Sequence, residues 1–338
     1  MTTPIRLRNA RARAALAAAV RAALGRLGYE EVETPSLVPA PGMEPHIDAF
    51  SAPFVPAAGG APQPRWLISS PEYAMKRLLA AGLPRIFQLS RVFRNGEVSA
   101  THNPEFTMLE LYRAGTDYAG IMTDLEQTIE ACARALSPDG SPRVHRGGAE
   151  LDFAGPFERL TVQEAFRRHA GVDLAACEGD AERLWAAARA AGQDAGPGGE
   201  PFDDVFFRVM LDAVEPRLGV GRPTYLVDWP ASMAALSKVK RGDPRWAERF
   251  ELYAGGLELA NGFTELNDAA EQRRRLVEEQ ELRRRLGRTV YPLDEPFLEA
   301  VGRMPDAGGV AVGFDRLLML LVDAGSISDV LLFPAHEF

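Results

Sequence analysis

Two stretches of the sequence carry side chains whose types and spacing suit ligand binding. Residues 85–94 and 105–113 both read as strands, and the segment between them is short enough for the two to pair. Because successive strand residues point to opposite faces, one face of the second strand would carry Phe106, Met108, Glu110 and Tyr112. Buried glutamate is rare unless it is paired, so this face suits a ligand, with an aromatic ring for stacking. From spacing alone, a solvated sheet face with one exposed phenylalanine explains the pattern equally well.

The rest of the chain predicts the elements that position this strand pair. Helices are expected over 7–27, 71–81, 117–136, 161–169, 181–191, 202–214 and 265–286, and from residue 314. Further strands are expected over 29–34, 65–68, 150–153, 224–228, 250–259 and 309–313. Strands near the middle are separated by tight loops, not by regular helices. This order predicts an α+β domain, an antiparallel sheet with helices around it, and not a doubly wound parallel sheet.

The residues of the strand pair resemble motif 2 of the class II aminoacyl-tRNA synthetases, in the lysine-specific branch. The resemblance lies in Phe93-Arg94-Asn95 and in the run HNPEFTMLELY at 102–112. Three further stretches agree in order along the chain. LGYEEVETP at 27–35 resembles motif 1, GLELANGFTEL at 256–266 resembles the strand before motif 3, and GVAVGFDRL at 309–317 resembles motif 3. Four ordered motifs make the resemblance far more specific than any one of them.

The resemblance implies a catalytic domain in which ATP lies bent on the antiparallel sheet and an amino acid is activated as an adenylate. In that reaction charge builds on phosphate oxygens, and a fixed guanidinium stabilises it. The motifs place Arg94 at the α-phosphate and Arg316 at the γ-phosphate, which makes these two the expected catalytic residues. The other expected ATP-binding residues are Asn95, Gly96, Asn103, Phe106 (stacked on adenine), Glu258, Leu259 and Gly313.

Glu258 and Glu265 are candidates for a magnesium site. They are seven residues apart, an odd separation that would place them on opposite faces of an uninterrupted strand. The pair Asn261-Gly262 between them indicates a bend or bulge that would turn both inward. Paired carboxylates beside a triphosphate suit Mg²⁺, which takes oxygen ligands. In the lysine branch the matching glutamates serve the metal and the substrate, and two solvated glutamates remain the alternative.

The resemblance also implies an amino-acid pocket that recognises a cation. Its expected residues are Ser70, Pro71, Glu72, Tyr112, Glu265 and Ala311. Buried carboxylates select for amines, because a ligand without the amine leaves a desolvated charge unpaired. Lysine or a lysine isomer is therefore the expected substrate. Ala311 stands where lysyl-tRNA synthetases usually have glycine and elongation factor P ligases have alanine, and one methyl could favour β-lysine by about 1–3 kcal/mol.

The length favours the truncated relatives that attach a lysine-type residue to elongation factor P. The first-motif helix begins near residue 7, so we expect one catalytic domain over 1–338 with no anticodon-binding OB domain, paired as a homodimer. Residues 70–79 and 230–232 resemble these ligases, whereas 151–158 and 329–334 look more like lysyl-tRNA synthetases. Gly96 departs from the acidic residue that normally follows Arg-Asn in motif 2, although Glu97 is adjacent.

Composition narrows the class of protein. The chain of 338 residues is 46% hydrophobic, which excludes global disorder, and its two cysteines exclude a disulfide framework. The longest apolar run, 317–322, is too short for a membrane span, and the start lacks a signal peptide, so we expect a cytoplasmic protein. The net charge of −9 argues against stable tRNA binding. The first 29 residues contain six arginines and no acid, which indicates either a solvated helix face or a docking face for an acidic partner.

Three functions follow as hypotheses. The first is ATP-dependent activation of lysine or (R)-β-lysine, followed by transfer to a lysine ε-amine of elongation factor P. The second is aminoacylation of tRNA or of a small amine. The third is a non-catalytic regulator that binds an amino acid, for which loss of Arg94 or Arg316 would be the expected sign, and both are present.

Overall fold

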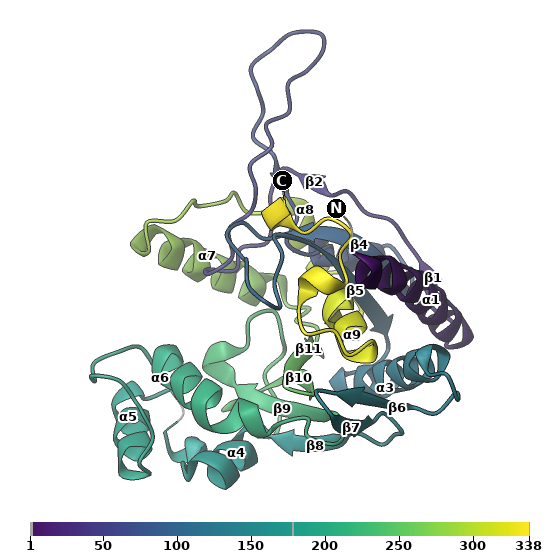
Figure 1. Ribbon diagram of the computed structural model, residues 1–338. Helices are drawn as coiled ribbons and strands as arrows, with labels where there is room; N and C mark the ends of the chain where they lie inside the picture. The colour runs from purple at the N-terminus through teal and green to yellow at the C-terminus, as the bar shows by residue number, and fades with distance from the viewer. Residues whose placement is uncertain (1–2, 178, 338) are drawn as a thin grey trace.

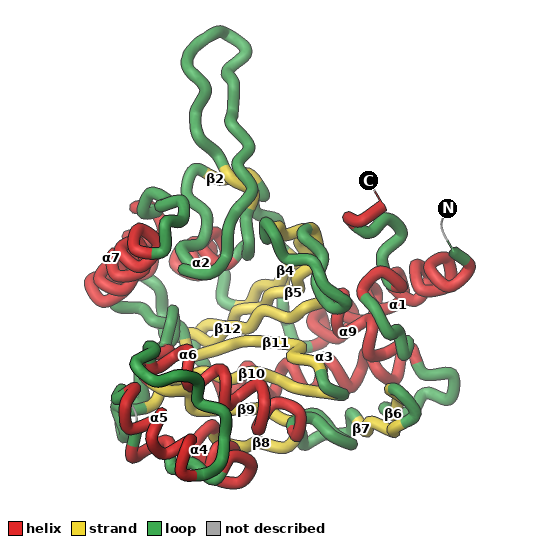
Figure 2. The backbone as a smooth tube through the Cα atoms, turned by 60° about the vertical axis from the view of Figure 1, so that its left-hand side comes forward, coloured by secondary structure: helices red, strands yellow, loops and turns green. Residues whose placement is uncertain are grey.

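A large sheet forms the centre of the computed structural model, which describes residues 3–177 and 179–337. Within these residues the sheet has eight strands, seen one above another in Figure 2. Their order is β1 (Glu30–Glu31), β4 (Arg85–Phe93), β5 (Glu105–Ala114), β12 (Ala307–Gly313), β11 (Leu257–Thr264), β10 (Trp246–Ala254), β9 (Thr224–Pro230) and β8 (Glu158–Thr161). The six central strands are antiparallel, and only the edge strands β1 and β8 pair in parallel. This confirms the predicted α+β class.

Three helices cover one face of the sheet and build the main core. They are α1 (Pro4–Arg26), α3 (Tyr118–Leu136) and α9 (Phe314–Leu321), grouped on one side of the strands in Figure 2. The Ala-rich α1 starts at Pro4, with Thr3 as its cap, and buries Leu16, Val20 and Leu24 completely. These side chains join one apolar cluster with those of α3, α9 and the central strands. Burial of apolar area of this kind is the main force that holds the layers together.

The opposite side of the sheet is left partly open and carries shorter elements around its rim. These are α2 (Glu72–Ala80), α7 (Ala269–Arg285), α8 (Glu295–Val301), and the paired strands β2 (Leu37–Val38) and β3 (Trp66–Leu67). A long loop between β2 and β3 projects away from the body in Figure 1. A second apolar cluster, centred on Phe206 and Trp229, packs α4 (Val162–Ala165), α5 (Ala181–Ala190) and α6 (Phe202–Val209) against the β8–β9 edge. In the described part of the chain, no helix combines the length and the apolar character that a bilayer span requires.

Several predicted boundaries were wrong. The clearest case is the segment 250–259, which was expected to be one strand. It is a hairpin of β10 and β11, turned at Gly255 and Gly256, whose φ angles of 57° and 74° lie in the left-handed region. A side chain at Gly255 would meet Leu320 and Leu151, so this turn requires glycine. The Gly-Gly pair was a usable turn signal. The helix expected over 265–286 begins only at Ala269. The strand expected over 150–153 is β7 (Ala149–Asp152), but its hairpin partner β6 (Arg143–Arg146), as well as α8 and β8, was not predicted.

Candidate active site

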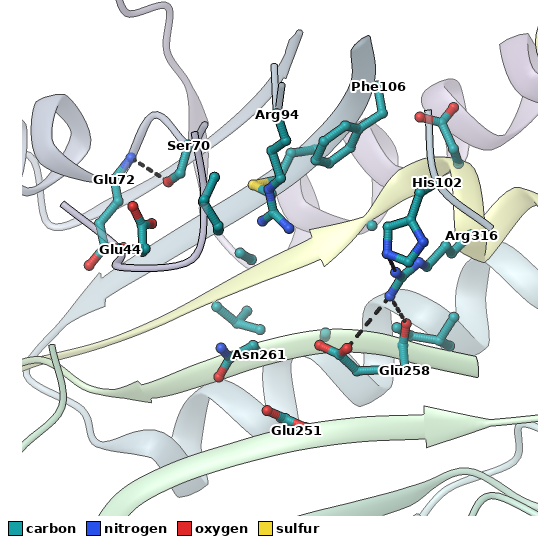
Figure 3. Close-up of a pocket in the computed structure, with 18 of the residues that line it drawn as sticks. Glu44, Ser70, Glu72, Arg94, His102, Phe106, Glu251, Glu258, Asn261 and Arg316 are labelled. Carbon is teal, nitrogen blue, oxygen red and sulfur yellow. Dashed lines mark hydrogen bonds and ion pairs between the residues drawn. The ribbon is translucent and has the colours of Figure 1, made fainter. Parts of the chain in front are cut away.

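A cavity of about 350 Å³ lies on the open face of the sheet, above β5, β12 and β11 (Figure 3). Most of the residues singled out from the sequence line it. They are Ser70, Glu72, Arg94, Asn103, Phe106, Tyr112, Glu258, Leu259, Glu265, Ala311, Gly313 and Arg316. Asn95 and Gly96 are exposed outside it, and Pro71 lines a neighbouring groove instead. The cavity therefore joins the strand face predicted from alternation to loops and helix ends far away in the sequence.

The strand register explains why large side chains fit on this face. On β12, Gly309 pairs with Tyr112 of β5, and Gly313 pairs with Met108. A Cβ atom on Gly309 would collide with the Tyr112 ring and with the Glu265 carboxylate. Glycine at this position therefore lets both side chains lie against the backbone of the neighbouring strand.

A β-bulge places the residues of β11 on the cavity face. Tyr253 of β10 pairs with Glu258, and Leu252 pairs with Ala260, so Leu259 has no partner. This extra residue resets the alternation, and both Glu258 and Glu265 line the cavity. The interruption lies at Leu259 and not at Asn261-Gly262, which the sequence had suggested; Gly262 pairs regularly with Val310.

The magnesium site predicted from Glu258 and Glu265 is wrong as a site for one ion. The two residues lie at opposite ends of β11, on the order of 20 Å apart at the rise of a strand. A single Mg²⁺ has ligands at about 2.1 Å, so it cannot take both carboxylates. The Glu265 carboxylate already forms an ion pair with Lys76 (2.6 Å). Among the described residues no cluster of three or more His, Cys, Asp or Glu suits a metal ion.

Glu251 is the carboxylate that sequence reasoning missed. It lies on β10 opposite Asn261 of β11, is buried, and accepts hydrogen bonds from Tyr253 (2.6 Å) and Arg249 (2.7 Å). Burial, followed by repulsion from Glu258, raises the pKa of Glu251 to about 7. The carboxylates of Glu251 and Glu258 repel each other, and two arginines lie beside them. This arrangement suits Mg²⁺, which prefers oxygen ligands and would take the remaining ones from phosphate. Glu251 therefore replaces Glu265 as the partner of Glu258.

Two arginines mark one end of the cavity. Arg94 follows β4, and its guanidinium lies 5.2 Å from the centre of the Phe106 ring and 3.7 Å from the Glu97 carboxylate. Gly96 has a φ of 87°, and this turn brings Glu97 to the cavity wall although Gly96 itself is outside. Glu97 thus supplies the acidic side chain that Gly96 lacks.

Arg316 is held by two segments that are distant from it in the sequence. It lies in the first turn of α9 and donates to the Glu258 main-chain oxygen (2.9 Å) and to Nε2 of His102, as Figure 3 shows. Burial and the adjacent Arg316 lower the pKa of His102, so the ring stays neutral and accepts this bond. Asp315, which is bound by Arg13 and by the Thr107 amide (2.6 Å), fixes the start of α9 on β5. His102 was not predicted as a site residue.

The other end of the cavity is acidic and buried. Glu110 is completely buried and accepts hydrogen bonds from Ser70 (2.6 Å) and Tyr112 (2.8 Å). Burial, together with the charge of Glu72, raises its pKa to about 8. Burial raises the pKa of Glu265 to about 8 as well, although Lys76 opposes the shift. Oε1 of Glu265 is buried without a hydrogen-bond partner in the described structure, so it can accept a bond from a ligand.

Comparison with known proteins supplies the family. The family model described as "tRNA synthetases class II (D, K and N)" matches residues 2–337. The chain belongs to this family. The match confirms the resemblance seen in the four motifs, and the sheet with its helices is the catalytic fold expected from it.

Curated relatives of this class II synthetase chain carry two kinds of name. It is 37% identical over 309 residues to a lysine–tRNA ligase of Pelotomaculum thermopropionicum, an alignment that covers 91% of this chain and 59% of the relative. It is 36% identical over 330 residues to an elongation factor P–(R)-β-lysine ligase of Sodalis glossinidius, covering 96% and 94%. The ligase of the same name from Salmonella paratyphi B is 38% identical over 326 residues, covering 96% and 94%. The chain thus spans about three fifths of the length of the first lysine–tRNA ligase.

Asn103 has a structural task in this class II synthetase that its motif did not indicate. Its side chain donates to the Glu105 main-chain oxygen (2.6 Å) and accepts from the Ala335 amide (2.9 Å). It therefore links the cavity wall to the C-terminal segment while still lining the cavity.

Proposed function

We propose that this chain is an ATP-dependent ligase that activates lysine or (R)-β-lysine as an aminoacyl-adenylate and transfers it to a lysine ε-amine of elongation factor P. One observation carries the proposal. A single cavity holds guanidinium groups at one end and buried carboxylates, with raised pKa values, at the other. The first end suits a triphosphate, and the second suits an ammonium group.

The guanidinium end serves the nucleotide. The amino-acid carboxylate attacks the α-phosphorus of ATP, the adenylate bond forms, and pyrophosphate leaves. Arg94 stabilises the charge that builds on the α-phosphate, and Arg316 holds the leaving group. Phe106 offers its ring to adenine, and Glu251 with Glu258 would hold Mg²⁺, which supplies positive charge to the phosphate oxygens.

The acidic end selects the amino acid. An ammonium group entering this end meets the free Oε1 of Glu265 beside Tyr112, whose hydroxyl donates to the buried Glu110. An amino acid of the same length without the distal amine would leave Oε1 of this carboxylate desolvated and without a hydrogen bond. The expected rejection is strong, because a site built to hydrogen-bond a polar group discriminates better than an apolar pocket.

The acceptor is the finer part of the proposal. In the transfer step the acceptor ε-amine attacks the carbonyl carbon of the adenylate, an amide bond forms, and AMP leaves. Support for elongation factor P comes from the similarity to ligases named for that factor, which extends over 94% of their length. Ala311, which lines the cavity opposite Glu110, supports β-lysine. We further propose that the chain acts as a homodimer.

The arginine-rich first helix is a weaker docking candidate than its composition suggested. Arg6 binds Glu337 (2.6 Å), Arg13 binds Asp315, and Arg21 binds Glu31 (2.9 Å). Half of the six arginines are therefore engaged within the protein. The docking role of α1 is not part of the proposal.

The test is the reaction itself. Purified protein is incubated with ATP, Mg²⁺, elongation factor P and either lysine or (R)-β-lysine, and the mass of the factor is measured. Addition of one lysyl residue supports the proposal, and Arg94→Ala should abolish it while leaving the folded protein intact. Amino-acid-dependent pyrophosphate exchange without modification of the factor, but with stable charging of tRNA, would favour the activity named in the lysine–tRNA ligase relatives.

A further inference from the structure

Glu44 lies in the cavity wall although no motif pointed to it. It belongs to the loop between β2 and β3, which is anchored on both sides of the residue. Met43 is 2% exposed and packs in the apolar cluster of α7 and α8. The buried Arg283 of α7 donates to the main-chain oxygens of Glu44 (2.7 Å) and Ile47 (2.9 Å). The position of Glu44 is therefore fixed by the fold.

The Glu44 side chain has an unused hydrogen-bonding atom. Its Oε2 is buried and has no partner among the described residues. The carboxylate folds back over Gly42, where an added Cβ atom would collide with it. A buried acceptor without a bond costs free energy, commonly about 1–3 kcal/mol, so such atoms in native sites are usually reserved for a ligand or water.

The surroundings of this atom favour a cation. Figure 3 shows Glu44 beside Glu72 at one end of the cavity, below Ser70. Burial, then the charge of Glu72, raises the pKa of Glu44, whereas Arg94 and Arg283 act in the opposite direction. Glu279 is also near Glu44, since the charge of Glu44 raises the pKa of Glu279. An ammonium group placed here would relieve the repulsion between the carboxylates.

The cavity thus contains two buried carboxylate oxygens without partners, Oε1 of Glu265 and Oε2 of Glu44. Lysine and β-lysine each carry two ammonium groups, one at the end of the chain and one near the carboxyl. Glu265 lies at the buried acidic end with Tyr112 and Lys76. Glu44 lies on the side of Arg94, next to which the reacting carboxyl must come.

We propose that Glu44 binds the ammonium group nearest the substrate carboxyl, the amine whose position distinguishes lysine from β-lysine. This inference rests on the proposed amino-acid activation. Together with Glu72, Glu44 brackets that amine between two carboxylates. Glu44 is thereby a substrate-binding and specificity-determining residue of the cavity, supplied by a loop and not by any of the four motifs.

The experiment compares wild type with Glu44→Gln, a change of nearly equal volume that removes the charge. Pyrophosphate exchange is measured with lysine, with (R)-β-lysine and with 6-aminohexanoate, which keeps the distal amine but has none near the carboxyl. Loss of a charge-assisted hydrogen bond should raise the KM for both lysine isomers about ten- to a hundredfold. The KM for ATP and the weak response to 6-aminohexanoate should not change.

Two kinetic results and one binding result would overturn the inference. The first is an unchanged KM for the lysine isomers in Glu44→Gln, and the second is an equal loss for all three compounds, which would indicate a structural role. Glu278→Gln, an exposed glutamate of α7, is the matched charge control and should behave as wild type. Calorimetry of lysine binding without ATP separates this inference from the proposed function. Binding that depends on Glu44 supports the inference even if exchange is absent, and a wild type that binds neither isomer contradicts it.

Discussion

Lys76 and Glu265 form an ion pair in which neither side chain is exposed, with 2.6 Å between Nζ and Oε2. The same ammonium group lies 2.5 Å from Oε1 of Glu72. Lys76 therefore joins a carboxylate of α2 to one at the end of β11, and both line the cavity. Burial opposes its charge, but the two glutamates raise its pKa overall. The lysine fixes the geometry of the acidic end before any substrate enters.

Lys76→Met should destabilise the protein strongly and in a pH-dependent way. Removal of one partner of a buried ion pair typically costs about 3–5 kcal/mol. A carboxyl left without its cation has a folded-state pKa further above its unfolded value, so the folded state binds more protons, and stability falls as pH rises. The loss in free energy of unfolding should be larger at pH 8 than at pH 6, as urea denaturation would measure. Lys238→Met, which removes a lysine from an exposed pair with Asp306, should have little effect. Equal losses for both variants would contradict the role of Lys76.

Amino-acid binding should weaken as pH falls through 8. The carboxyls of Glu110 and Glu265 have pKa values of about 8 in the free site, and both must be ionised to bind an ammonium group well. Each ionised form is lost below its pKa, while the distal amine of lysine stays charged because its pKa is about 10.4. Between pH 8.5 and 6.5 the dissociation constant for lysine should rise roughly 25-fold for each carboxyl that must ionise. Calorimetry across this range checks it, and Glu110→Gln should give a shallower dependence. A dissociation constant that is flat over these pH values would refute the assignment.

Glu251→Gln should change the response to magnesium. The variant keeps an oxygen that accepts from Tyr253, so the fold should persist, but it removes a charge from the pair with Glu258. The Mg²⁺ concentration for half-maximal pyrophosphate exchange should rise by about tenfold or more, because a hard cation prefers charged oxygen ligands. Glu265→Gln provides the comparison: it should raise the KM for lysine and leave the magnesium response alone. If the two variants behaved the other way round, the corrected assignment would be wrong.

The sequence predicted the parts of the site that depend on local pattern. Alternation along β5 placed Phe106, Met108 and Tyr112 on one face correctly, since a regular strand has a period of two residues. It could not locate the bulge at Leu259, because the unpaired residue is defined by its partners on β10. The wrong pairing of Glu258 with Glu265 has another cause: both do face the cavity, but the length of β11 separates them.

Residues positioned by long-range contacts were not predictable in the same way. Glu44 looked like part of a Pro- and Gly-rich loop, and its place in the cavity depends on Arg283, which lies 239 residues further along the chain. Glu251 looked like one acid in an ordinary strand until the β10–β11 hairpin set it beside Glu258. What marks both Glu44 and Glu251 as site residues is that their charged side chains are buried, and burial cannot be read from a single sequence.

Ala311→Gly should shift the choice between lysine isomers toward lysine. Ala311 lies on β12 between Glu110 of β5 and Asn261 of β11, with its methyl group in the cavity wall. Removing that methyl enlarges the acidic end beside Glu110, and a methyl-sized difference in a pocket changes selectivity by about 1–3 kcal/mol. The ratio of kcat/KM for (R)-β-lysine to that for lysine, measured by pyrophosphate exchange, should fall about tenfold or more. Ala307→Gly is the matched control, because Ala307 is a buried alanine of the same strand outside the cavity wall. It should cost similar strand stability and leave the ratio unchanged, so a shift of equal size in both variants would show that strand flexibility, and not the methyl group, sets the preference.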